Sequence, residues 1–114
     1  MDAKEIVDLC KQHTMWTWAK GNDVVPWPIV GAEGIYLHGA DGSRIIDFNS
    51  QLMSVNIGHG HPKVREAMKN QIDELLYVWP GAATPVRARV AQKMAALLPG
   101  HLNTVFFALG GAEA

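Results

Sequence analysis

The feature that most constrains the fold is an apolar run near the C-terminus that leads into a glycine pair. Residues 105–109 are continuously apolar with β-branched and aromatic members, which is typical of a strand buried on both faces of a sheet. Gly110 and Gly111 follow, and residues 112–114 favour the start of a helix. Small residues let a ligand approach the backbone, while successive N–H groups and the helix dipole favour negative charge. The pattern therefore predicts a corner that binds a phosphate group.

A buried central strand needs neighbouring strands and covering helices, and little of the remaining sequence can supply them. We therefore expect the 114 residues to be the N-terminal piece of a larger α/β protein. On its own, the chain should be poorly folded, because its apolar strand would lack partners.

The composition is that of a globular protein, with 48% hydrophobic residues, 18% charged residues and a net charge of −1. Without a basic excess, nucleic acid and acidic membrane surfaces are not expected partners. No apolar run is long enough to span a bilayer, and the N-terminus lacks a signal-peptide pattern. The single cysteine, Cys10, cannot form an internal disulfide, which fits a cytoplasmic location.

The spacing of apolar residues predicts an amphipathic helix over residues 2–20, ended by Gly21 and Asn22. Residues 24–28 must then be extended, because proline fixes its own φ and disfavours helix in the residue before it. Trp27 lies between two prolines in this stretch. It either packs at the surface or an interface, or it lines a ligand site.

Two further patterns predict a β-hairpin and a pair of helices. Residues 35–37 and 44–48 flank a turn-rich linker, which indicates antiparallel strands. Pro62 is placed to begin a helix, and Thr84 is placed to cap another that begins at Pro85. Both helices carry apolar residues at helical spacing, so each should bury one face.

His59 and His61 lie two residues apart, which raises the possibility of a metal site. A zinc site needs further ligands, and Asp47 is the only plausible carboxylate just upstream. We therefore expect no metal at these histidines.

Three blocks of the sequence, in this order, resemble the N-terminal quarter of a class III (omega-type) aminotransferase. They are DGSRIIDF at 41–48, NIGHGHP at 56–62 and VFFALGGAEA at 105–114. The resemblance implies the fold type I architecture of enzymes that use pyridoxal 5′-phosphate (PLP), and a homodimer. It assigns residues 1–75 to the N-terminal part of the small domain and residues 76–114 to the start of the large PLP-binding domain.

The resemblance also implies roles for the glycine corner. Gly110, Gly111 and Ala112 match the turn that holds the cofactor phosphate in this family. Relatives usually have hydroxyl side chains at the first and third positions, so this chain would rely on backbone N–H groups. The Schiff-base lysine of the family lies far downstream, and none of the six lysines here matches it. No catalytic residue is therefore assigned, and the chain alone should be inactive.

For the substrate pocket, the resemblance implies roles for Met53 and Trp79, and we group Trp27 with them. Met53 occupies a position where amine-accepting relatives often carry a large aromatic residue; ordinary core packing is the alternative. Trp79, Pro80 and Gly81 resemble a loop that crosses the dimer interface and helps line the neighbouring subunit's active site. Plain interface packing is the alternative for this loop.

Three functions remain open at this point. The first is transamination between an amine or amino acid and a keto acid by the full-length protein. The second is another PLP reaction on the same fold, such as that of an aminomutase or a dialkyl-amino-acid decarboxylase. The third is a truncated binding or assembly module without catalysis.

Overall fold

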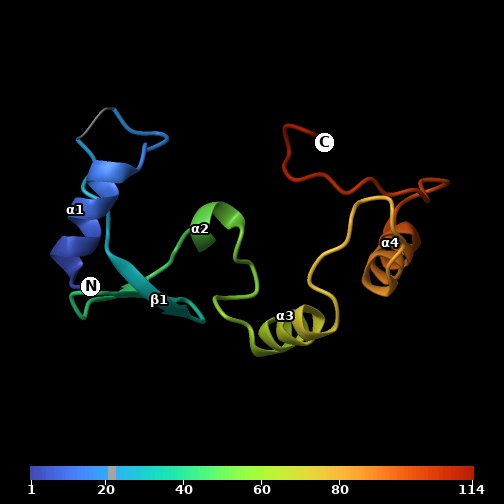
Figure 1. Ribbon diagram of the computed structural model, residues 1–114, viewed down its shortest axis with the longest axis horizontal. Helices are drawn as coiled ribbons and strands as arrows, with labels where there is room; N and C mark the ends of the chain where they lie inside the picture. Colours follow the sequence, from blue (N-terminus) through green and yellow to red (C-terminus); the bar gives the residue numbers. More distant parts are fainter. Residues whose placement is uncertain (21–22) are drawn as a thin grey trace. The chain divides into compact units, whose positions relative to one another are not determined.

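The computed structural model describes residues 1–20 and 23–114, which form two compact units, Met1–Glu74 and Leu75–Ala114. Unit 1 contains α1 (Ala3–His13), β1 (Ile29–Glu33), β2 (Tyr36–Gly39), β3 (Arg44–Ile46), α2 (Ser50–Met53) and α3 (Pro62–Glu74). Unit 2 contains α4 (Pro85–Leu97), the loop before it and the C-terminal segment after it (Figure 1).

Helix α1 is shorter than the sequence predicts. It begins after Asp2, whose side chain accepts a 2.8 Å hydrogen bond from the Glu5 N–H, and it ends at His13. Thr14 closes it with extended backbone and a hydrogen bond from its N–H to the Cys10 carbonyl. The prediction of a helix to residue 20 was therefore wrong, and the expected stop at Gly21 and Asn22 lies outside the described residues.

The sheet of unit 1 has three antiparallel strands in the order β1-β2-β3. The predicted hairpin is confirmed, because Leu37 pairs with Ile45 and His38 pairs with Arg44. Strand β1 was not predicted, since its glycine and the prolines before it are unfavourable in strands. Leu37, on the central strand, is the one buried hydrophobic residue among residues 1–20 and 23–114.

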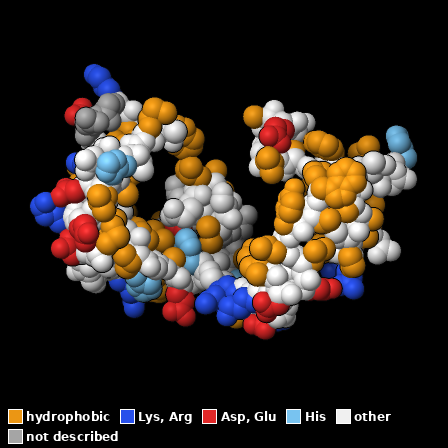
Figure 2. Space-filling view, viewed as in Figure 1, with side chains coloured by type: hydrophobic (Ala, Val, Ile, Leu, Met, Phe, Trp, Pro, Cys, Tyr) orange, Lys and Arg blue, Asp and Glu red, His pale blue; other side chains and the backbone are white. Residues whose placement is uncertain are grey.

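The helices begin where the sequence predicts but expose their apolar faces. Pro62 opens α3, and the Thr84 side chain caps α4 by accepting a 3.3 Å hydrogen bond from the Arg87 N–H. The expected burial of their apolar stripes was wrong: Met68 on α3 is 62% exposed, and α4 buries no residue. Within its unit, neither helix has extensive contacts with another element. Figure 2 shows apolar side chains lying open over both units.

The expected buried strand at residues 105–109 was also wrong. These residues belong to no strand, and Phe106 and Leu109 are 84% and 97% exposed. The physical reason is that unit 2, as described, contains no strand with which they could complete a hydrogen-bond ladder. No helix in the part of the chain that the structure describes is long and apolar enough to cross a membrane.

Candidate functional site

The glycine corner forms a hydrogen-bonded turn. The Gly110 carbonyl accepts hydrogen bonds from the N–H groups of Glu113 at 3.1 Å and Ala114 at 3.3 Å, as in the first turn of a helix. On the N-terminal side of the glycine pair, the Leu109 N–H donates a 2.9 Å hydrogen bond to the Glu113 carboxylate. Across residues 1–20 and 23–114, nothing accepts a hydrogen bond from the N–H groups of Gly111 or Ala112.

This corner fits an anionic group such as a phosphate. A Cβ added at Gly110 or Gly111 would meet nothing within 4 Å, so the space beside the backbone is open. The main-chain donors of Gly111 and Ala112 have no competing acceptor in the described structure. Neither Gly110 nor Ala112 offers a hydroxyl, so binding there depends on the main chain.

Trp79 belongs to the same unit as the glycine corner. It lines an open cavity of about 550 Å³ together with Pro80, Arg87, Phe107 and Leu109. The Trp79 indole lies against Gly81, where an added Cβ would come within 2.3 Å of the ring. Glycine is therefore required at position 81 for this packing, and the structure brings Trp79 to the apolar segment that leads into the corner.

Trp27 and Met53 both belong to unit 1, where Trp27 lines a cavity that Met53 does not line. Trp27 lines a cavity of about 340 Å³ with Asp47, Phe48, Asn49 and Gln51. Met53 is 72% exposed and does not line this cavity. The structure thus brings Trp27 to the segment that precedes Met53, while the Met53 side chain stays open to solvent within its unit.

The segment that carries Met53 has an unusual backbone. Ser50, Gln51, Leu52 and Met53 all have positive φ, between 50° and 60°, so α2 is a single left-handed turn. None of the four is glycine, and left-handed helical backbone costs a non-glycine residue roughly 1–2 kcal/mol. Strain of this kind persists only where surrounding contacts hold it, and it is concentrated at functional sites.

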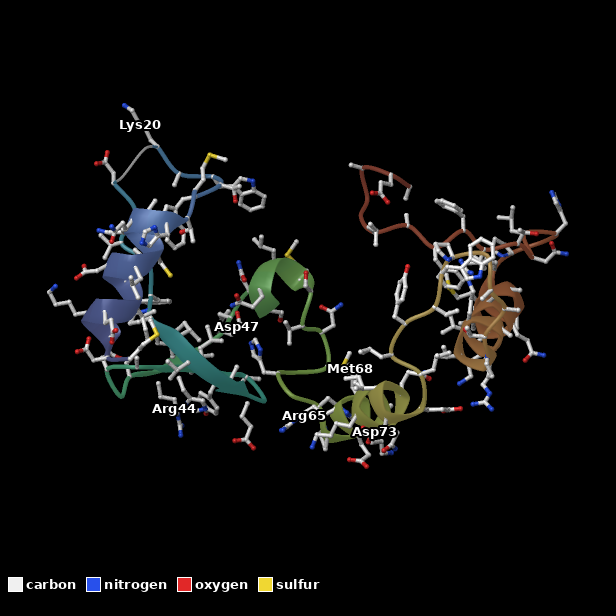
Figure 3. All side chains as sticks on the ribbon, in the orientation of Figure 1. Lys20, Arg44, Asp47, Arg65, Met68 and Asp73 are labelled. Carbon is white, nitrogen blue, oxygen red and sulfur yellow. The ribbon has the colours of Figure 1, made fainter. Side chains whose placement is uncertain are left out.

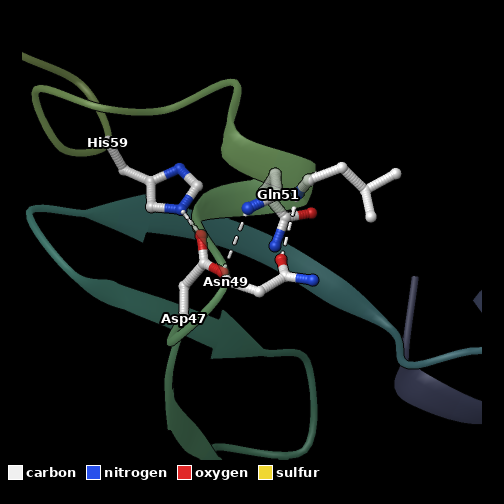
Figure 4. A network of polar contacts seen from close by, with 5 residues as sticks. Asp47, Asn49, Gln51 and His59 are labelled. Carbon is white, nitrogen blue, oxygen red and sulfur yellow. Dashed lines mark hydrogen bonds and ion pairs between the residues drawn. The ribbon is translucent and has the colours of Figure 1, made fainter.

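A polar network holds this turn (Figure 4). Asp47 accepts a 3.2 Å hydrogen bond from the Gln51 N–H through one carboxylate oxygen, and its other oxygen lies 2.7 Å from His59 Nε2. Asn49 Oδ1 accepts a 3.0 Å hydrogen bond from the Leu52 N–H. Figure 3 shows Asp47 on the segment between β3 and α2.

The electrostatics of Asp47 favour its ionised form. Burial acts to raise the pKa of Asp47, but the hydrogen bonds from His59 and Gln51 outweigh it and leave that pKa below its ordinary value. An ionised carboxylate only accepts hydrogen bonds, so His59 Nε2 carries the proton of this contact. In the sequence, Asp47 and His59 stand out individually only as candidate metal ligands. The described residues contain no group of three or more potential metal ligands.

The sequence profile of the family described as Aminotransferase class-III matches residues 17–114. A probable 4-aminobutyrate aminotransferase from Bacillus subtilis is 40% identical over 89 residues, which cover 75% of this chain and 20% of the relative. A β-alanine–pyruvate aminotransferase from Pseudomonas aeruginosa is 39% identical over 90 residues, which cover 77% of this chain and 20% of the relative.

Solved structures show the same likeness. An (S)-enantioselective omega-transaminase from Thermomicrobium roseum superposes with a TM-score of 0.88 at 31% identity, covering 96% of this chain and 26% of that one. A taurine:2-oxoglutarate aminotransferase from Bifidobacterium kashiwanohense, in complex with PLP and glutamate, superposes with a TM-score of 0.79 at 31% identity. That match covers 84% of this chain and 21% of the other. The α/β architecture is therefore that of the corresponding part of these enzymes, and the chain spans about a fifth to a quarter of their length.

Proposed function

Because this chain belongs to the class III aminotransferase family, we propose that the whole protein is a PLP-dependent enzyme that transfers an amino group between an amine or amino acid and a keto acid. The observation that carries the proposal is the glycine corner, whose main-chain donors are free and whose space is open. It lies within the residues that match the family.

In this proposal, Gly110, Gly111 and Ala112 hold the phosphate of PLP. The Gly111 and Ala112 N–H groups donate to the phosphate oxygens, and the turn that follows adds favourable backbone dipoles. The chemistry that PLP supplies when bound is an electron sink for the carbon that carries the amino group. The chain's own part is to bind and orient, since none of its six lysines matches the Schiff-base position, and we expect it to be inactive alone.

We further propose that Met53, Trp27 and Trp79 contribute walls to the substrate pocket. These three large apolar side chains are exposed within their own units. Exposed apolar surface of this kind marks binding sites, so other parts of the protein can complete a pocket around it. Trp79, Pro80 and Gly81 are proposed to lie near the interface of a homodimer. The Trp79 indole packs against Gly81, which supports a defined contact surface at this loop.

Two further assignments complete the proposal. Residues 1–75 are assigned to the small domain and residues 76–114 to the start of the large domain; the division of contacts at Leu75 is in keeping with this boundary. A cytoplasmic location is proposed from the single cysteine, Cys10, which has no internal partner for a disulfide.

The test uses the full-length protein supplied with PLP. β-Alanine, 4-aminobutyrate and taurine, each taken from the name of a relative or a neighbouring structure, are offered as donors with pyruvate or 2-oxoglutarate. We expect loss of the donor amine only when a keto acid is present, with an equal amount of new amino acid formed from that keto acid. Rearrangement of the amine without a keto acid would indicate an aminomutase, and release of carbon dioxide a decarboxylase. Either result, or no reaction with any donor, would contradict the proposal.

A further inference from the structure

We propose that Asp47 and His59 are positioning residues for the amine pocket: they hold the left-handed turn Ser50–Met53, and thereby fix the wall that Met53 presents to apolar amines. This inference rests on the proposed transaminase function. It adds to that function a pair of residues that need not touch the substrate.

The turn Ser50–Met53 needs an anchor. Its own hydrogen bonds are local: the Met53 N–H donates to the Asn49 carbonyl at 3.0 Å, and the Ser54 N–H donates to the Ser50 carbonyl at 2.9 Å. The Gln51 N–H, at the centre of the turn, donates to Asp47 Oδ1 at 3.2 Å, which is also a contact within four positions. None of these hydrogen bonds by itself joins the turn to the sheet, so the anchor depends on what holds the Asp47 side chain.

Asp47 is itself fixed by a residue twelve positions away. His59 Nε2 lies 2.7 Å from Asp47 Oδ2, and the two side chains are only 14% and 5% exposed. Little exposure means that solvent screens this contact weakly, so it is worth more than a surface ion pair. His59 therefore holds the carboxylate in the orientation that the Gln51 N–H requires.

His59 is in turn anchored to the sheet. Its backbone forms an antiparallel bridge with Gly34, in which the His59 N–H donates at 2.7 Å and the Gly34 N–H donates back at 3.0 Å. A chain of contacts thus runs from the turn between β1 and β2, through His59 and Asp47, to α2. The strained turn is held against the sheet by this chain.

The anchored turn presents apolar side chains. Leu52 and Met53 are 53% and 72% exposed. Their apolar side chains are therefore presented by the left-handed turn that Asp47 and His59 hold in place. An amine with an apolar substituent binds more tightly when the Met53 side chain is already held in place. Ordering that side chain then costs no further entropy on binding. A small amine such as alanine has little apolar surface to gain from this wall.

The experiment uses the full-length holoenzyme and the variants Asp47→Asn and His59→Gln. We expect KM for 1-phenylethylamine to rise about tenfold, as expected when binding to one apolar side chain is lost. The kcat with this amine, and both constants with L-alanine, should stay within about twofold of wild type. The matched control is Asp41→Asn. Asp41 is also a carboxylate that accepts a backbone hydrogen bond, from the Ser43 N–H at 3.0 Å, but it lies in the turn between β2 and β3. This variant should leave both KM values unchanged.

A rescue variant separates positioning from general stability. Glycine adopts positive φ without strain, so Ser50→Gly should let the turn hold its shape without the anchor. Added to His59→Gln, it should return KM for 1-phenylethylamine to within about twofold of wild type. If KM rises equally for both amines, or if Ser50→Gly restores nothing, the inference is overturned.

Hydrogen exchange over residues 49–55 provides a readout independent of catalysis. The Gln51, Leu52 and Met53 N–H groups should exchange at least tenfold faster in His59→Gln than in wild type, and unchanged protection would overturn the inference. A wild-type enzyme that consumes no amine would instead defeat the transaminase proposal, while the exchange measurement would still test the anchor.

Discussion

Arg87 donates a 2.6 Å hydrogen bond from Nη1 to the carbonyl oxygen of Pro80. The same nitrogen lies 3.4 Å from the Ala82 carbonyl, and the guanidinium stands 5.8 Å from the centroid of the Phe107 ring. One side chain of α4 therefore links the Trp79 loop to the apolar segment that leads into the glycine corner.

Replacing Arg87 with methionine keeps most of the apolar stem but removes the donors. Because Arg87 is exposed, we expect a loss of only about 1 kcal/mol in the free energy of unfolding of the full-length enzyme. The larger effect should be faster hydrogen exchange over residues 79–84, where the Ala82 N–H bonds to the Trp79 carbonyl. Arg89→Met on the same helix is the control, and equal exchange in both variants would contradict the role given to Arg87.

Gly58 provides a test of the bridge between His59 and Gly34. Its φ is +86°, and an added Cβ would lie 3.1 Å from the Gly34 carbonyl oxygen. Gly58→Ala should therefore lower the free energy of unfolding by about 1–3 kcal/mol, since it adds backbone strain and a close contact. Gly34→Ala is the matched control, because its φ is also positive but nothing lies within 4 Å of an added Cβ. A thermal scan in which Gly34→Ala is the less stable variant would rule out the close contact as the cause.

The lowered pKa of Asp47 predicts a stability effect on the acid side. A carboxyl group with a folded pKa below its unfolded value of about 3.9 stabilises the fold fully above that pH. This stabilisation is lost as pH falls through the lower folded pKa. The Tm difference between wild type and Asp47→Asn should therefore be constant near pH 6 and shrink below about pH 4. Asp73→Asn, on the exposed side of α3, serves as the control, and a Tm difference for Asp47→Asn that persists unchanged at low pH would refute the prediction.

Substitutions at Gly111 separate the effect of charge from the effect of size at the glycine corner. A single negative charge about 4 Å from a phosphate charge costs about 4 kcal/mol at an effective dielectric constant of 20, or roughly a thousandfold in affinity. Gly111→Asp should therefore abolish PLP binding in a spectroscopic titration of the full-length protein. Gly111→Asn has the same size without the charge, and the open space at this position should hold its loss to about tenfold. Unchanged cofactor affinity in Gly111→Asp would defeat the assignment of the corner.

The 114-residue chain by itself should unfold without a cooperative transition. Among the described residues, Leu37 alone forms a buried hydrophobic core, and large apolar side chains such as Phe48 at 95% and Leu109 at 97% remain exposed. So little buried apolar area cannot offset the entropy of ordering the chain. Circular dichroism during heating should show a gradual change, and a sharp sigmoidal transition in the monomer would contradict this expectation.

Local sequence signals predicted most of the elements correctly. Pro62 and Thr84 mark helix starts through backbone rules that act within a few residues, and the turn between β2 and β3 follows from its glycines and Asp41. The glycine corner was found in the same way, because its turn depends on residues 109–114 alone. Strand β1 was missed because pairing with β2 overrides its poor intrinsic propensity.

The sequence by itself determined the helix starts, the hairpin and the hydrogen-bonded turn that follows Leu109, since each is fixed by the conformational preferences of neighbouring residues. Only the tertiary structure decided that Asp47 and His59 meet across twelve positions, and that four successive non-glycine residues adopt left-handed backbone. No local preference favours that backbone. It exists because contacts from the sheet, transmitted through His59 and Asp47, outweigh the strain of the turn they hold.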